Sequence, residues 1–152
     1  MSFIDQLYKD FVITDITELE EDSENNLEEI YNRLTMDLPE ECKFILENYE
    51  RVVLGNLNEN GDGYKFAISL SGAGVFLNEL IYLQEEFSVD DIGNVIPIGD
   101  DVGDSMLLYG IGNEGLALYL AEGGSLDKDD YIKLSDTISD FFCKGIGIEK
   151  LI

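Results

Sequence analysis

From residue 52 onward, apolar residues come in short runs that glycine-rich or acidic turns separate. Runs of this length, rich in β-branched and aromatic residues, predict strands. Because the gaps between most of these runs are short enough for turns, consecutive strands should pair in an antiparallel sheet. The strands that we expect cover residues 52–54, 64–70, 95–98, 106–109 and 115–120.

The N-terminal part of the chain has a different spacing of apolar residues. Ser2 suits the cap of a short helix over 3–11, in which Phe and Leu recur at every fourth position. Residues 12–16 are mostly β-branched and fit either a short strand or a lead into the next helix. The acidic stretch 17–33 predicts one helix, or two helices with a break near 23–26.

Four further segments complete the expected elements. Residues 78–87 fit a helix, although a strand is also possible, and residues 133–145 predict a closing amphipathic helix. Between the strands, 72–74 allows a tight bend before 75–77. Pro39 suits the first turn of a helix whose apolar face is Cys42, Ile45, Leu46 and Tyr49.

Helices first, then consecutive strands, then a helix indicate the α+β class. The length of 152 residues suits one domain over 1–152. We expect a mostly antiparallel sheet of about five or six strands, flanked by N-terminal helices and a C-terminal helix. Residues 1–36 would be an acidic helical extension of the same domain.

The most informative stretch is 95–109, which predicts a strand, an acidic glycine turn and a second strand. Gly99 and Gly103 bracket a pair of aspartates, and glycine and aspartate favour tight turns. Pro97 cannot donate a ladder hydrogen bond, so it should lie at a strand end or at an edge.

This stretch resembles the SUKH superfamily, which includes bacterial immunity proteins and a fungal cell-wall-synthesis regulator. Its pattern is an aliphatic-Pro-aliphatic run, a small residue, acidic residues and then Gly-Asp before a strand. The resemblance extends over about 37–147 and includes the Leu38-Pro39 helix, the strand at 115–120 and the closing helix with Phe141 and Phe142. The chain departs from the family at Glu50-Arg51, where members often carry Asn-Gly-Gly.

The resemblance implies an immunity or antitoxin protein that binds and neutralises a cognate toxin domain. On this interpretation the protein is not an enzyme, has no catalytic residue and binds no cofactor or metal. The fungal member implies an alternative, a cytoplasmic regulatory scaffold that binds other proteins without a toxin partner. A large toxin gene beside the gene for this chain would favour the first interpretation.

The net charge of the chain indicates which classes of partner it can bind. Asp and Glu number 33 against 9 Lys and Arg, a formal net charge of −24. Such a charge repels phosphate backbones and anionic membranes, so we expect neither nucleic acid nor a membrane as a direct partner. It attracts basic proteins, and nuclease- or deaminase-type toxins have basic substrate grooves. Solubility alone is the alternative explanation of the charge.

The absence of histidine excludes several chemistries. Neither Ser-His-Asp nor Cys-His catalysis is possible, and neither is a histidine-ligated zinc site. Cys42 and Cys143 lie in helical patterns without a CxxC motif, which favours two buried thiols in a reducing compartment. A disulfide between them stays possible if their helices pack together. Met1 to Phe11 has no basic start with a long apolar run, so we expect a cytoplasmic protein.

Two motifs imitate ligand sites. Residues 56–61 begin like an EF-hand loop, but Ala67 stands where the bidentate Glu is needed. Residues 110–115 match GxGxxG, but the following residues are strand-like and no helix start receives a phosphate. Both segments therefore predict hairpin turns.

The acidic residues are the candidate partner-binding site. Asp100, Asp101 and Asp104 could form a solvated turn, a protein-binding edge, a cation site or a paired-carboxylate acid–base site. The predicted contact residues are Glu18, Glu20, Glu21, Asp22, Glu24, Glu28 and Glu29 in the N-terminal segment, and Asp100, Asp101 and Asp104 in the motif turn.

Overall fold

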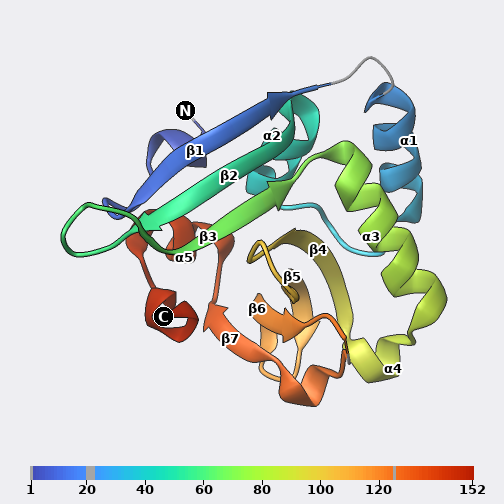
Figure 1. The fold of residues 1–152 in the computed structure, drawn as a ribbon. Helices are drawn as coiled ribbons and strands as arrows, with labels where there is room; N and C mark the ends of the chain where they lie inside the picture. Colours follow the sequence, from blue (N-terminus) through green and yellow to red (C-terminus); the bar gives the residue numbers. More distant parts are fainter. Residues whose placement is uncertain (1, 20–22, 125) are drawn as a thin grey trace.

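A computed structural model describes residues 2–19, 23–124 and 126–152 (Figure 1). In this part of the chain seven strands form one sheet, in which spatial order follows sequence order and every neighbouring pair is antiparallel. The strands are β1 (Phe11–Glu18), β2 (Tyr49–Leu57), β3 (Tyr64–Ser71), β4 (Asn94–Asp100), β5 (Ser105–Gly112), β6 (Gly115–Glu122) and β7 (Ile132–Ser135).

The helices lie around this sheet and close its ends (Figure 1). The α-helices are α1 (Ser23–Arg33), α2 (Glu40–Asn48), α3 (Ala73–Glu86), α4 (Val89–Ile92) and α5 (Ile138–Lys144). Three short 3-10 helices are η1 (Phe3–Asp5), η2 (Lys128–Asp130) and η3 (Ile148–Leu151). The α+β class is confirmed, and the described strands number seven rather than five or six.

The N-terminal prediction is wrong in two places. The helix expected over 3–11 is only the single turn η1, and Phe11 already begins β1. The ring of Phe11 packs against Phe141 and Phe142, with centroids 5.7 and 5.6 Å apart, and these contacts hold the chain at the sheet. The helix expected over 17–33 begins only at Ser23, because Thr17 and Glu18 continue the β-branched strand.

The C-terminal prediction is wrong in its first part. Residues 133–135, expected at the start of the closing helix, belong to β7 and pair with β6. The helix begins after Thr137, whose hydroxyl accepts the amide of Asp140 at 3.0 Å and caps α5. It ends at Gly145, which has a φ of 75°.

The segment that fitted either a helix or a strand is a helix, and it starts earlier than expected. α3 runs without a break from Ala73, so 75–77 is helical rather than a separate piece after a bend. The bend itself lies at Gly72, where a Cβ would stand 2.1 Å from the carbonyl oxygen of Tyr49. Only glycine allows β3 to turn this close to β2.

The sheet consists of two halves, β1–β3 and β4–β7, that are joined at a narrow point. β3 and β4 pair only at Ser69 with Asp100 and at Leu70 with Gly99. Pro97 lies inside β4, but in the part that has a partner on one side only, opposite Leu108 of β5. This local edge explains how a proline fits within an interior strand.

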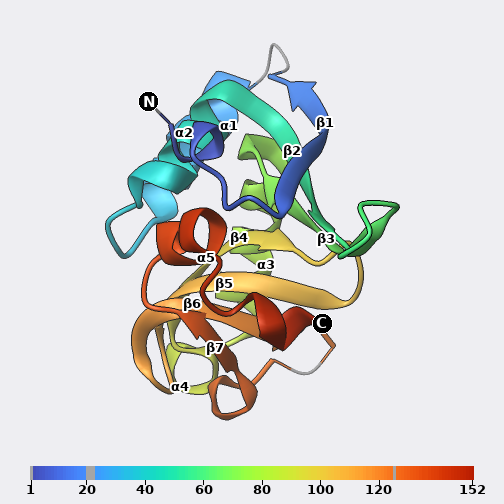
Figure 2. The same cartoon turned by 90° about the vertical axis from the view of Figure 1, so that its left-hand side faces the viewer.

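The hydrophobic core covers both faces of the second half. Along β5 and β6, Leu107 and Leu118 face the main core with α2 and α5, whereas Leu108 and Tyr119 face a second cluster at α4. This alternation is the period-two geometry of strands. Figure 2 shows α5 in front of the sheet, beside β4 and β5.

Truncation of the central aromatic side chain should destabilise the fold strongly. Phe141 is fully buried, so Phe141→Ala should lower the free energy of unfolding by about 3–5 kcal/mol. Urea unfolding measures the change. Ile111→Ala, at a side chain that is 54% exposed, is the control and should stay within about 0.5 kcal/mol of the wild type. A loss below about 1 kcal/mol for Phe141→Ala would contradict this core.

Candidate functional site

None of the described acidic side chains is fully buried. Among the described residues the buried polar side chains are Asn56, Ser69, Ser71 and Ser135, and no Asp or Glu is among them. The ion pairs in this part of the chain are Arg33–Glu29, Arg51–Asp15, Lys133–Asp136 and Lys144–Asp140. With 9 basic against 33 acidic residues, even complete pairing would leave a large negative surplus.

The first predicted cluster is spread over two elements. Glu18 is exposed at the end of β1, and Glu24, Glu28 and Glu29 are exposed on α1. Glu29 is paired with Arg33 one helical turn later, at 3.1 Å. Glu20, Glu21 and Asp22 lie outside the described residues.

The second predicted cluster is the turn between β4 and β5. One carboxylate oxygen of Asp100 accepts the amide of Val102 at 2.8 Å, and one of Asp101 accepts the amide of Ser105 at 3.2 Å. Val102 has a φ of 61°, a conformation that costs energy for a β-branched residue. Asp100 and Asp101 therefore hold the turn together, whereas Asp104 is exposed.

The structure does not bring the two clusters together. Glu18 lies opposite Tyr49, at the end of the sheet where β3 finishes. Asp100 lies opposite Ser69, and the turn continues from it toward the beginning of β3. In Figure 2 this turn lies on the side of the β2–β3 hairpin, away from α1. A partner that touches both clusters must therefore cover a long stretch of surface.

The two imitated ligand motifs are hairpin turns, as predicted. In the β2–β3 turn, the side-chain oxygen of Asn58 accepts the amides of Asn60 and Asp62, and strands lie on both sides. In the β5–β6 turn, Gly112 pairs with Gly115 and no helix follows. Among the described residues no group of three histidine, cysteine or acidic side chains is arranged to hold a metal ion.

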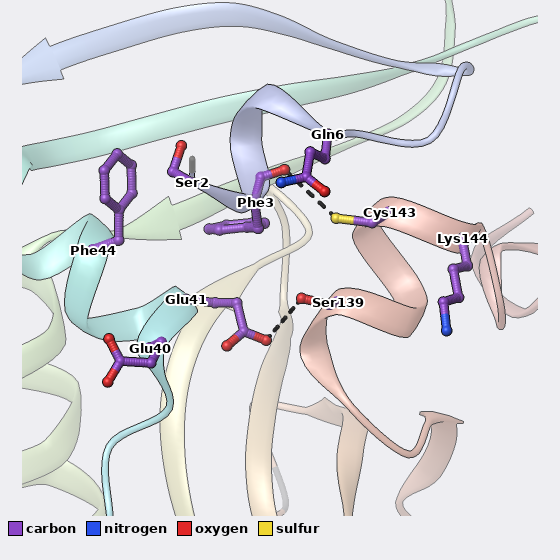
Figure 3. A pocket seen from close by; sticks show the side chains of 9 residues that line it. All are labelled: Ser2, Phe3, Gln6, Glu40, Glu41, Phe44, Ser139, Cys143 and Lys144. Atoms are coloured by element: carbon purple, nitrogen blue, oxygen red, sulfur yellow. Dashed lines mark hydrogen bonds between the residues drawn. The ribbon is translucent and has the colours of Figure 1, made fainter.

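A groove of about 600 Å³ opens between η1, α2 and α5 (Figure 3). Its lining comes from both ends of the chain and from the middle, so sequence reasoning had no signal for it. On one wall the hydroxyl of Ser139 donates to Glu41 at 3.0 Å. The lining residues are Ser2, Phe3, Gln6, Glu40, Glu41, Phe44, Ser139, Cys143 and Lys144.

Both cysteines are free thiols, so the possible disulfide is absent. The thiol of Cys143 donates weakly to the carbonyl oxygen of Phe3, with the two atoms 3.5 Å apart. Burial raises the pKa of Cys143, and Glu41 raises it further, against a lowering by Ser139. Burial also raises the pKa of Cys42 strongly. Since the thiolate is the reactive form, neither cysteine is an activated nucleophile.

Sequence reasoning did not identify the outer edge of β1 as a feature. The six residues from Ile13 to Glu18 are all exposed, and the described chain places no strand beside this edge. The mostly β-branched residues 12–16 were the available signal, but they were also compatible with a lead into a helix.

Comparison with known proteins gave no match to a family model or to a curated protein. The resemblance to the SUKH superfamily therefore stays a prediction. None of the helices in the described ranges is long and apolar enough to cross a membrane.

The negative charge of Asp100, at the start of the acidic turn, affects the ionisation of Glu79 on α3. Burial raises the pKa of Glu79, and the negative charge of Asp100 raises it further. The folded protein therefore binds more protons at Glu79 than the unfolded chain between the two pKa values. The contribution of Glu79 to stability therefore falls as the pH rises through this window.

Removal of the Glu79 charge should therefore stabilise the protein near neutral pH. Glu79→Gln should raise the melting temperature at pH 7.5, and the gain should vanish when the pH falls below the unfolded-state pKa, where Glu79 is protonated in both states. Thermal unfolding across this pH range is the measurement. Glu85→Gln, at an exposed position of the same helix, is the control. An equal gain at low pH would show that charge is not the cause.

Proposed function

We propose that the protein is an immunity protein that binds and neutralises a cognate basic toxin domain of the nuclease or deaminase type. The observation that carries the proposal is the surplus of negative charge, none of it on a fully buried side chain among the described residues. The resemblance of the β4–turn–β5 stretch to the SUKH superfamily supports the same function.

The charge would act in two ways on such a toxin. It would steer the basic toxin domain toward the protein and raise the association rate, because complementary potentials act before contact. It would also compete with a phosphate backbone for the basic groove, so that bound protein excludes the substrate. A standard interface takes about 800 Å² from each partner, a small part of the 7925 Å² of accessible surface.

The acidic side chains near the motif support binding rather than chemistry. Asp100 and Asp101 each use a carboxylate oxygen to hold the turn, which leaves Asp104 as the exposed charge. The thiols of Cys42 and Cys143 have raised pKa values and stay protonated near neutral pH. Neutralisation by occlusion requires none of these groups to react.

The function is tested by capture followed by rescue. Tagged protein captures partners from the native lysate at low salt and at about 0.5 M NaCl, where screening is strong. We expect to capture one basic domain, whose binding is weaker at high salt but is not lost. That domain should stop growth when expressed alone, and co-expression of this protein should restore growth. A captured domain that stays toxic in the presence of the protein would overturn the proposal.

Charge reversal separates the two predicted clusters. Glu24→Lys with Glu28→Lys changes the α1 cluster, and Asp104→Lys changes the motif turn without touching the carboxylates that hold it. The variant on the contacting cluster should lower the association rate with the captured toxin by about tenfold at low salt. Stopped-flow binding at several salt concentrations measures the rate. A cluster whose reversal leaves the rate and its salt dependence unchanged does not contact the toxin.

A further inference from the structure

The two edges of the sheet differ in length and in cover. β7 has four residues, and the C-terminal segment lies against it. The ammonium group of Lys150 donates to the carbonyl oxygen of Lys133, and a Cβ at Gly147 would stand 2.1 Å from the carbonyl oxygen of Leu134. β1 has eight residues and is the outermost strand, with no strand on its far side in the described chain (Figure 1).

The free edge of β1 offers backbone hydrogen-bonding groups. The amide of Leu57 donates to the carbonyl oxygen of Asp10 at 2.8 Å, so these two residues form a hydrogen-bonded pair. Such pairs alternate along an antiparallel ladder. Ile13, three residues further on and opposite Leu54, therefore belongs to a non-hydrogen-bonded pair. Its N–H and C=O point away from β2, toward the open edge.

The side chains of β1 add apolar surface and negative charge to this edge. Ile13 and Ile16 are 41% and 40% exposed. Asp15 and Glu18 are exposed on the same strand. Asp15 is paired with Arg51 of β2 at 3.3 Å, whereas Glu18 has no basic partner within the described residues.

The charge decides between two possible occupants. A second copy of this chain would bring another β1, with its own Asp15 and Glu18, against the same two acidic residues. Like charges directly opposite in a sheet are destabilising, and each copy carries a net charge of −24. An extended segment rich in lysine and arginine would instead place opposite charges across the ladder, with its aliphatic stems over Ile13 and Ile16.

We propose that β1 is a docking edge to which an extended, basic segment of the toxin adds as an eighth strand of the described sheet. The identity of the occupant rests on the proposed function, whereas the docking mode rests on the geometry of β1. Backbone hydrogen bonds supply affinity, as in other cases of strand addition, and the charges select the partner.

A peptide experiment tests the edge without the toxin. The probe is a short peptide of alternating lysine and valine, and its control has alternate backbone amides N-methylated, which keeps the charge and removes the donors. The unmodified peptide should slow hydrogen exchange in residues 11–18. The N-methylated peptide should bind at least about tenfold more weakly, which corresponds to a loss of about 1.4 kcal/mol of binding free energy. Equal binding of both peptides, or no protection of β1 by either, would overturn the proposal.

Two substitutions test the same edge from the protein side. Ile13→Pro removes an outward N–H without removing a hydrogen bond to β2. It should weaken binding of the lysine-valine peptide by about tenfold. Glu18→Lys should weaken binding of the same peptide by up to about fivefold. Glu86→Lys, an equal charge change at the exposed end of α3 in the other half of the molecule, should have little effect (Figure 1). An unchanged melting temperature shows that each variant folds.

The captured toxin separates failure of this proposal from failure of the proposed function. If Ile13→Pro binds and neutralises the toxin as the wild type does, the docking edge is overturned and the function stands. If no captured domain is toxic but the peptide protects β1, the function fails and the edge stands. A dimer in solution that Ile13→Pro dissociates would assign the edge to a second copy and overturn the proposal.

Discussion

The packing of Phe11 against Phe141 and Phe142 joins the first strand of the sheet to the last helix. The three rings lie 4.9 to 5.7 Å apart, and Phe3 adds a fourth ring 5.8 Å from Phe142. Because the two sheet halves share only two residue pairs, this cluster is a main contact between the N- and C-terminal parts of the chain. Burial of several large rings in one place stabilises this arrangement strongly.

The rest of β1 is less buried than its first residue. Phe11 is buried, but the side chains from Ile13 to Glu18 are exposed, so the strand is held by its ladder with β2 and by its first residue. An edge of this kind usually carries a device against pairing with copies of itself. In this protein β1 has two exposed acidic side chains, Asp15 and Glu18, and two register shifts, between Ile13 and Asp15 and between Thr17 and Glu18. Both features work against pairing with an identical strand.

Several elements were predictable because the local pattern and the tertiary environment agree. The β4–turn–β5 stretch has two apolar runs around Gly99 and Gly103, and the structure has a strand at each run and a turn between them. The elements that were wrong have patterns that fit two states. Residues 132–135 share apolar positions with the following helix, and only pairing with β6 makes them a strand. The β-branched residues after Phe11 likewise become β1 only because β2 lies beside them.

The sequence by itself determined the α+β class, the hairpin turns, the absence of histidine chemistry and the strong negative charge. These properties depend on composition and on contacts between residues that are close in the chain. Only the tertiary structure decided that Asp100 and Asp101 hold their own turn, that the two acidic clusters lie apart and that β1 keeps an open edge. Those properties depend on which distant segments pair and on which side chains the packing covers. The local sequence pattern does not specify which distant strands pair.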